Sequence, residues 1–151
     1  MVWGAVTYSG VGKLHILRGK IDAAPYIDVH DTSYLATVAE SGLDLTKVIF
    51  QQDNAPIHTA KATKRWLSEH RVQTLVWPPC SPDQSIIENL WDYVEKRLRK
   101  IQPAAQTVEQ HTRNIEMAWY ATPVEYVQAL YDSIPRRLEA LRANHGRYTK
   151  Y

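Results

Sequence analysis

The chain has 151 residues, of which 44% are hydrophobic, and a net charge of +2 at pH 7. This length fits one domain with its own core and leaves no room for a second. The single cysteine, Cys80, excludes an intrachain disulfide and fits a reducing compartment, so we expect the nucleus or the cytoplasm. No apolar run approaches the ~20 residues of a membrane span, so we expect no membrane partner.

The first third of the chain predicts a hairpin, a helix and a further strand. Apolar residues over 1–7 and 13–17, on either side of a glycine-containing turn, predict the hairpin. Pro25 fits the first position of a helix that runs to Gly42. The β-branched and aromatic residues of 47–52 predict a buried strand.

The middle third alternates helix and strand. Residues 59–70 predict a helix that buries Ala62 and Trp66. Residues 72–77 predict a strand, which ends where two prolines remove ladder donors. From Ile87 to Ile101, apolar residues recur at steps of three and four, so one face of that helix packs inward.

Beyond Pro103 the sequence predicts helices only. Thr107, Thr122 and Ser133 each fit a helix N-cap, and the first two begin capping-box patterns. The order of elements therefore predicts an α/β layer fold with a helical C-terminal appendage.

Two acids, Asp53 and Glu88, stand in distinctive settings, with 34 residues between them. Asp53 closes an apolar strand, and Glu88 begins an amphipathic helix. A carboxylate at a strand end and another on an adjacent helix can converge on a hard cation such as Mg²⁺. The alternative for Asp53 is a turn position, and the alternative for Glu88 is a capping box with Ser85.

Three ordered motifs resemble the catalytic domain of Tc/mariner-type transposases, which are DDE enzymes on a ribonuclease-H-like fold. The motifs are residues 52–60, 77–83 and 87–91. Residues 2–6 and 12–15 are similar to the second and third strands of that family, so the resemblance covers about residues 1 to 100.

The resemblance implies a mixed sheet with flanking helices. It also implies a partial catalytic core over residues 1–102 and a helical extension of the same domain over 103–151. Asp53 would be the second acid of the family's three and Glu88 the third, holding Mg²⁺ or Mn²⁺ for DNA cleavage and strand transfer in transposition and integration. Transposon-end DNA and a second copy of the chain are the implied partners.

The resemblance also has departures. In the family the first acid lies on a central strand upstream of Val2-Trp3-Gly4, so we expect this chain to lack both. Asp22, Asp28, Asp31 and Asp44 all follow that point. We therefore expect little activity from the chain alone and one weakly held metal. We also expect strands 1–7 and 47–52 to be present but not paired in the family manner, with a gap near twice the usual ~4.8 Å strand spacing or an irregular direct contact between them. Gln84-Ser85-Ile86 also replaces the family's Leu-Asn-Pro.

Two basic clusters could contact DNA phosphates, although helix faces solvated by Lys and Arg explain such clusters equally well. The residues are Lys61, Lys64, Arg65 and Arg71 in one cluster and Lys96, Arg97, Arg99 and Lys100 in the other. These clusters support an alternative function, a non-catalytic transposase-derived protein that binds DNA or protein. We interpret His58 as a hydrogen-bonded structural residue, and the alternative that the resemblance implies is that it orients a ligand or contacts DNA.

Overall fold

The computed structural model describes residues 1–19 and 21–151, which form two compact units. The first unit comprises Met1–Ala5 and Gly12–Cys80, and the second comprises Val6–Val11 and Ser81–Tyr151. The N-terminal hairpin contributes to both, because its tip belongs to the second unit. No helix in these residues is long and apolar enough to cross a membrane.

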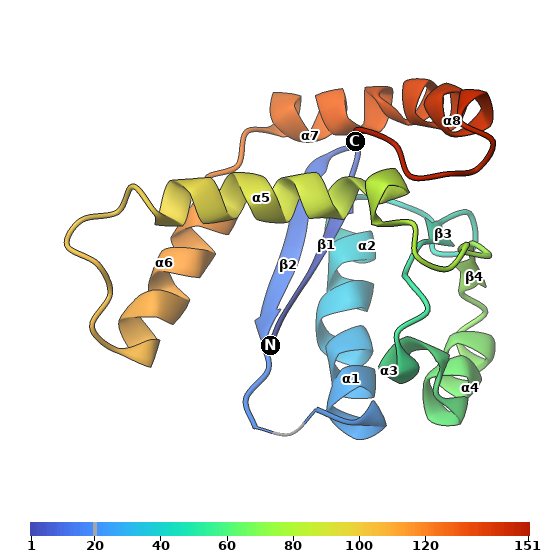
Figure 1. The fold of residues 1–151 in the computed structure, drawn as a ribbon. Helices are drawn as coiled ribbons and strands as arrows, with labels where there is room; N and C mark the ends of the chain where they lie inside the picture. Colours follow the sequence, from blue (N-terminus) through green and yellow to red (C-terminus); the bar gives the residue numbers. More distant parts are fainter. Residues whose placement is uncertain (20) are drawn as a thin grey trace. The chain divides into compact units, whose positions relative to one another are not determined.

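The hairpin consists of β1 (Val2–Thr7) and β2 (Gly10–Ile16), as Figure 1 shows. Its turn is tighter than the sequence suggested, because β2 begins at Gly10 rather than at Lys13. Gly10 adopts a φ of 128°, which only glycine reaches readily, and the Ser9 N–H donates to Thr7 Oγ1 at 3.2 Å.

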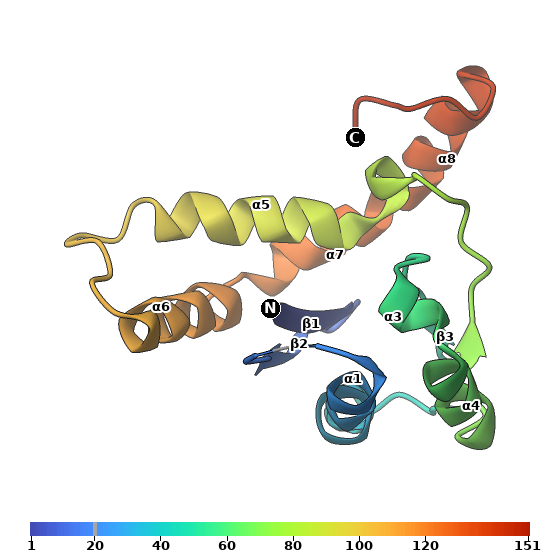
Figure 2. The same ribbon diagram turned by 60° about the horizontal axis from the view of Figure 1, so that its bottom comes forward.

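The predicted helix from Pro25 to Gly42 is present but begins earlier. It comprises α1 (Ala23–Val29), a π-helical turn (His30–Tyr34) and α2 (Leu35–Glu40). Asp22 sets the start, since its carboxylate accepts from the Ala24 N–H at 3.2 Å. This helical segment lies beside the base of the hairpin in both views (Figures 1 and 2). The contact is close: the Lys13 N–H donates to Thr37 Oγ1 at 2.9 Å.

The strands predicted at 47–52 and 72–77 are much shorter than expected. They are reduced to β3 (Ile49–Phe50) and β4 (Gln73–Thr74), which pair in parallel, Ile49 opposite Gln73 and Phe50 opposite Thr74. The prediction of a fully buried strand is wrong, because Ile49 is 62% exposed. β3 has a ladder partner on one side only, so its second edge gains no cover from a neighbouring strand.

The helix predicted at 59–70 is divided into α3 (Pro56–Thr59) and α4 (Lys61–Glu69). Ala60 between them is extended, with a ψ of 145°, so the helical phase restarts. For that reason the prediction of a buried Ala62 is wrong. Its neighbour Thr63 is buried instead and donates its hydroxyl to the Ile57 carbonyl at 2.7 Å.

Within the described residues the strands form two separate two-stranded sheets, β1 with β2 and β3 with β4. This confirms the prediction that the first strand and the Asp53 strand are both present but not paired with each other. Helices and partly buried side chains close the core of the first unit. Its buried cluster consists of Tyr34, Val38, Trp66, Leu67 and Val72.

The second unit is helical apart from the hairpin tip, as predicted for the C-terminal part of the chain. After a 3₁₀ turn (Pro82–Gln84) come α5 (Ile86–Leu98), α6 (Val108–Tyr120), α7 (Val124–Asp132) and α8 (Ile134–Ala143). Leu90, Trp119 and Val127 are fully buried in it, and the Trp91 and Trp119 rings stack with centroids 4.8 Å apart.

The three predicted helix caps differ in outcome. Thr107 and Gln110 form a complete capping box at the start of α6. Thr122 does not cap α7: Pro123 occupies the N-cap, and the Thr122 hydroxyl donates back to the Ala118 carbonyl at 3.3 Å. Ser133 occupies the N-cap of α8, but its side chain makes no capping bond.

Candidate active site

Asp53 lies in the first unit, in the loop between β3 and α3. Its Oδ1 accepts from the Ala55 N–H at 2.9 Å, the geometry of an Asx turn, and hydrogen-bonds His58 Nδ1 at 2.6 Å. The Asp53 side chain is nevertheless 65% exposed. Both of these bonds use Oδ1, so neither of them engages the second carboxylate oxygen, which is a potential oxygen ligand.

His58 fixes the orientation of this carboxylate. Its ring lies beside the Tyr26 ring, with centroids 4.9 Å apart, and the Tyr26 hydroxyl donates to Gln52 Oε1 at 2.9 Å. Tyr26 is buried, and burial raises the pKa of its hydroxyl. His58 is hydrogen-bonded, as interpreted, but its partner is the candidate ligand Asp53, so the alternative that it orients a ligand stays open. Sequence reasoning missed its partner, Asp53, which lies five residues away.

Glu88 lies in the second unit, exposed on the first turn of α5. The capping-box alternative requires a capping bond from the Ser85 side chain. Ser85 occupies the N-cap of α5, but its side chain makes no such bond. The Ser85 N–H donates instead to the Pro82 carbonyl at 2.9 Å. Asp53 and Glu88 belong to different units, so their predicted convergence within about 4 to 8 Å, close enough to share one cation, stays a prediction.

Three other aspartates of the first unit have separate engagements. Asp22 caps α1, Asp31 Oδ1 accepts from Trp66 Nε1 at 2.8 Å, and Asp44 Oδ1 accepts from the Thr46 N–H at 3.0 Å and the Thr46 hydroxyl at 2.7 Å. Across residues 1–19 and 21–151, His, Cys, Asp and Glu form no group of three or more that could hold a metal ion.

All eight basic residues predicted to contact DNA are exposed, but they differ in their partners. Arg65, Lys96 and Arg99 form ion pairs of 2.6 to 2.7 Å with acids four residues away on the same helix, and these acids raise the pKa of each base. Arg97 donates to the Tyr93 hydroxyl at 3.0 Å. The remaining four take part in no ion pair among the described residues: Lys61, Lys64, Arg71 and Lys100.

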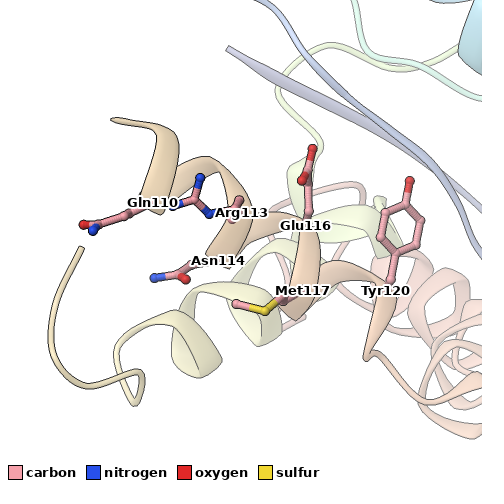
Figure 3. Close-up of a pocket in the computed structure, with 6 residues that line it drawn as sticks. All are labelled: Gln110, Arg113, Asn114, Glu116, Met117 and Tyr120. Atoms are coloured by element: carbon pink, nitrogen blue, oxygen red, sulfur yellow. The ribbon is translucent and has the colours of Figure 1, made fainter. Parts of the chain in front are cut away.

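A recess on the surface of α6 contains none of the predicted site residues. Figure 3 shows that its lining comes from this one helix. A single helix face does not surround a ligand, so we assign no site to it. The lining residues are Gln110, Arg113, Asn114, Glu116, Met117 and Tyr120.

Comparison with known proteins identifies the class. The family model described as DDE superfamily endonuclease matches residues 2–111, which is more than half of the chain. The matched stretch contains both Asp53 and Glu88. The chain belongs to this family, and its sequence relatives are transposases of the Tc1/mariner type.

One relative is the Tcb1 transposase of Caenorhabditis briggsae, 36% identical over 151 residues, which cover 100% of this chain and 54% of the relative. The chain thus spans about half the length of the curated relatives it matches. The catalytic domain of Mos1 transposase with raltegravir and Mn is 22% identical, with a TM-score of 0.87 over 99% of this chain and 76% of that one. The Mos1 paired-end complex with the left transposon end is 23% identical, with a TM-score of 0.85 over 97% of this chain and 44% of that one. These structures show that the fold is ribonuclease-H-like.

Proposed function

We propose that this chain supplies part of the catalytic domain of a transposase that cleaves and joins DNA, with Asp53 and Glu88 as two of its metal ligands. The observation that carries the proposal is the setting of Asp53. Its carboxylate is exposed after a strand, oriented through one oxygen by His58 and the Ala55 N–H, within the stretch that matches the family. Residues 1–102 would form the partial core, and residues 103–151 its helical extension.

The donor set fits Mg²⁺ or Mn²⁺, because both proposed ligands are exposed carboxylates and hard cations prefer oxygen. When bound, such an ion activates the attacking oxygen and stabilises the leaving one. Asp53 and Glu88 would hold it, and His58 would keep the Asp53 carboxylate in one orientation through its 2.6 Å bond to Oδ1. We propose that these residues alone transfer no DNA strand, since no third acid joins Asp53 among the described residues.

The proposed partners are DNA and a second copy of the chain. The name of the Mos1 paired-end complex, which includes a transposon end, supports both. A protein with these partners acts where the DNA is, in the nucleus or the cytoplasm. Lys61, Lys64, Arg71 and Lys100 are the best placed to contact phosphates, because within the described part of the chain no ion pair neutralises their charges and they do not share the Arg97 contact with a tyrosine.

Titration with Mn²⁺ tests the metal site. Paramagnetic broadening should affect the NMR signals of Asp53 and Glu88 first, and Asp53→Ala should weaken the broadening at Glu88. Asp28→Asn, which changes an exposed acid on α1, is the matched control and should leave the broadening unchanged. Absence of broadening at both acids would contradict the proposal. Metal-dependent cleavage of transposon-end DNA by this chain would contradict the proposed inactivity.

DNA binding is tested by comparing two lysines. Lys64→Gln removes a lysine outside the ion pairs, whereas Lys96→Gln removes one already paired with Asp92 at 2.6 Å. We expect Lys64→Gln to lower the slope of log affinity against log salt by about 1, and Lys96→Gln to lower it less. Binding that does not respond to salt would contradict an electrostatic mode, and equal effects would contradict the distinction between the groups.

A further inference from the structure

Asn89, the residue that follows Glu88, is held by two side chains from other helices of the second unit. Its side-chain Oδ1 accepts from Arg137 Nη2 at 2.7 Å, and its carbonyl accepts from the Tyr126 hydroxyl at 3.2 Å. Arg137 comes from α8 and Tyr126 from α7. The first turn of α5 is thus tied to the two helices that follow α6 in the sequence.

The segment in front of α5 is held by the same arginine. Arg137 Nη1 donates to the Asp83 carbonyl at 2.8 Å, and its Nε donates to Ser133 Oγ at 2.8 Å. Asp83 itself directs its carboxylate to the C-terminal tail: Oδ2 accepts from the Thr149 N–H at 2.9 Å and from the Thr149 hydroxyl at 2.7 Å. These bonds lower the pKa of Asp83, although burial opposes them.

These three polar residues are almost completely buried. Arg137 is 3% exposed, Asp83 is 4% exposed and Thr149 is 7% exposed. Buried bonds from a charged donor are stronger than those at the surface, and a buried acceptor that loses its donor is costly. The Arg137 guanidinium also lies over the Tyr151 ring, 5.0 Å from its centroid. The cluster therefore holds together the segment before α5, helix α8 and the C-terminal tail.

The start of α5 gains less from its N-cap residue than the start of α6 does. The Ser85 side chain makes no capping bond, whereas Thr107 at the start of α6 forms a complete box. A first turn without the bond from its N-cap side chain frays more readily, and Glu88 lies in that turn. The bonds from Arg137 and Tyr126 to Asn89 take over part of the ordering that a cap would provide.

We propose that Arg137, braced by Asp83 and the C-terminal tail at Thr149, is a positioning residue for Glu88. It does not touch the metal; it fixes the backbone that carries the ligand. This inference rests on the proposed function for its role in metal binding, but the ordering of the turn can be tested without metal. A lysine cannot replace the arginine, because one ammonium nitrogen does not reproduce a planar fork that reaches Ser133, Asp83 and Asn89 at once.

Amide hydrogen exchange by NMR in the metal-free chain tests the ordering. The Glu88 amide, which donates to the Ser85 carbonyl at 3.3 Å, should exchange about tenfold or more faster in Arg137→Lys. The His111 amide on α6 should not change. Arg136→Lys, an exposed neighbour on the same helix, is the matched control and should change neither amide. Thr149→Val removes the hydroxyl donor to Asp83 Oδ2 but leaves the Thr149 N–H and Gln84 Nε2 as donors, so it should accelerate exchange of the Glu88 amide by a smaller factor.

Mn²⁺ titration of the same variants tests the consequence for the ligand. In Arg137→Lys the affinity read from the Glu88 signal should fall about tenfold, as for other residues that orient a metal ligand. Equal acceleration of exchange at Glu88 and His111 would show a general loss of stability and overturn the positioning role, as would unchanged exchange at Glu88 in both Arg137→Lys and Thr149→Val. If the unaltered chain shows no broadening at either acid, the proposed function fails, while the exchange result still decides the role of Arg137.

Discussion

Each unit buries one large basic side chain, His30 in the first and Arg137 in the second, and the two are accommodated in opposite ways. In the first, His30 is fully buried among aromatic rings, and neither ring nitrogen has a hydrogen-bond partner. In the second, Arg137 is 3% exposed and donates hydrogen bonds to Ser133, Asp83 and Asn89. His30 stabilises its unit through ring packing, and Arg137 stabilises its unit through directed hydrogen bonds.

The difference follows from charge. A neutral imidazole can pack as an aromatic ring, and His30 stacks on Trp66 at 5.0 Å and meets Tyr26 edge-on at 4.5 Å. A guanidinium stays charged, so its burial is tolerated only when its donors are satisfied. The stability of the first unit should therefore depend on the fit of its side chains and on the protonation of His30. The stability of the second unit should depend on individual hydrogen-bond donors.

The largest effect is expected from Arg137→Met, which keeps an apolar stem and removes the fork. The Asp83 carbonyl, Asn89 Oδ1 and Ser133 Oγ would lose their buried donor, so the free energy of unfolding of the second unit should fall by about 4 kcal/mol. Urea denaturation followed at residues of each unit measures it. A loss below about 1 kcal/mol would remove the contrast between the units.

A fall in pH should destabilise the first unit. Burial, with smaller effects of His58 and His70, lowers the pKa of His30 from 6.5 to about 4, and Asp31 opposes this. Between these values the unfolded chain binds more protons, so stability is complete above pH 6.5 and falls as the pH drops towards 4, by about 3 kcal/mol. Denaturation across this range measures the slope, which His30→Phe should reduce. An unchanged slope in that variant would assign it to other groups.

Gly12→Ala tests sensitivity to shape in the first unit. A Cβ at this position would lie 2.2 Å from Thr37 Cγ2, so β2 and α2 would have to separate, at about 2 kcal/mol. The comparison is Gly19→Ala, where the new carbon meets nothing within 4 Å and only the φ of 77° opposes the change. Thermal unfolding of both variants measures the difference, and an equal loss would exclude the steric explanation.

The smallest expected effect has the opposite sign. The Tyr34 hydroxyl is buried without a partner, so Tyr34→Phe should raise the free energy of unfolding by about 1 kcal/mol. Tyr131→Phe is the control, because its hydroxyl donates to the Val6 carbonyl at 2.9 Å and its loss should destabilise. Destabilisation by both variants would mean that the Tyr34 hydroxyl has a bound water in solution.

Several features of the site were predictable from nearby residues alone. Asp53 after an apolar strand, Glu88 at the start of an amphipathic helix and the Thr107 capping box all follow from patterns within a few residues. Thr122 shows the limit of such patterns. Its sequence fits a capping box as well as that of Thr107, yet its hydroxyl turns back to the preceding helix. Two local arrangements of similar energy compete there, and packing selects one.

The sequence by itself determined the order of helices and strands, because this order depends on periodicity, caps and turns, whereas several ends of these elements differ from the predicted ones. Only the tertiary structure decided that Arg137 is buried rather than part of a basic surface. Its partners Asn89 and Asp83 lie 48 and 54 positions away in the sequence, and the exposure of Ile49 likewise could not be deduced from its apolar neighbours. Burial and long-range hydrogen bonds depend on which segments meet, and no local pattern specifies that.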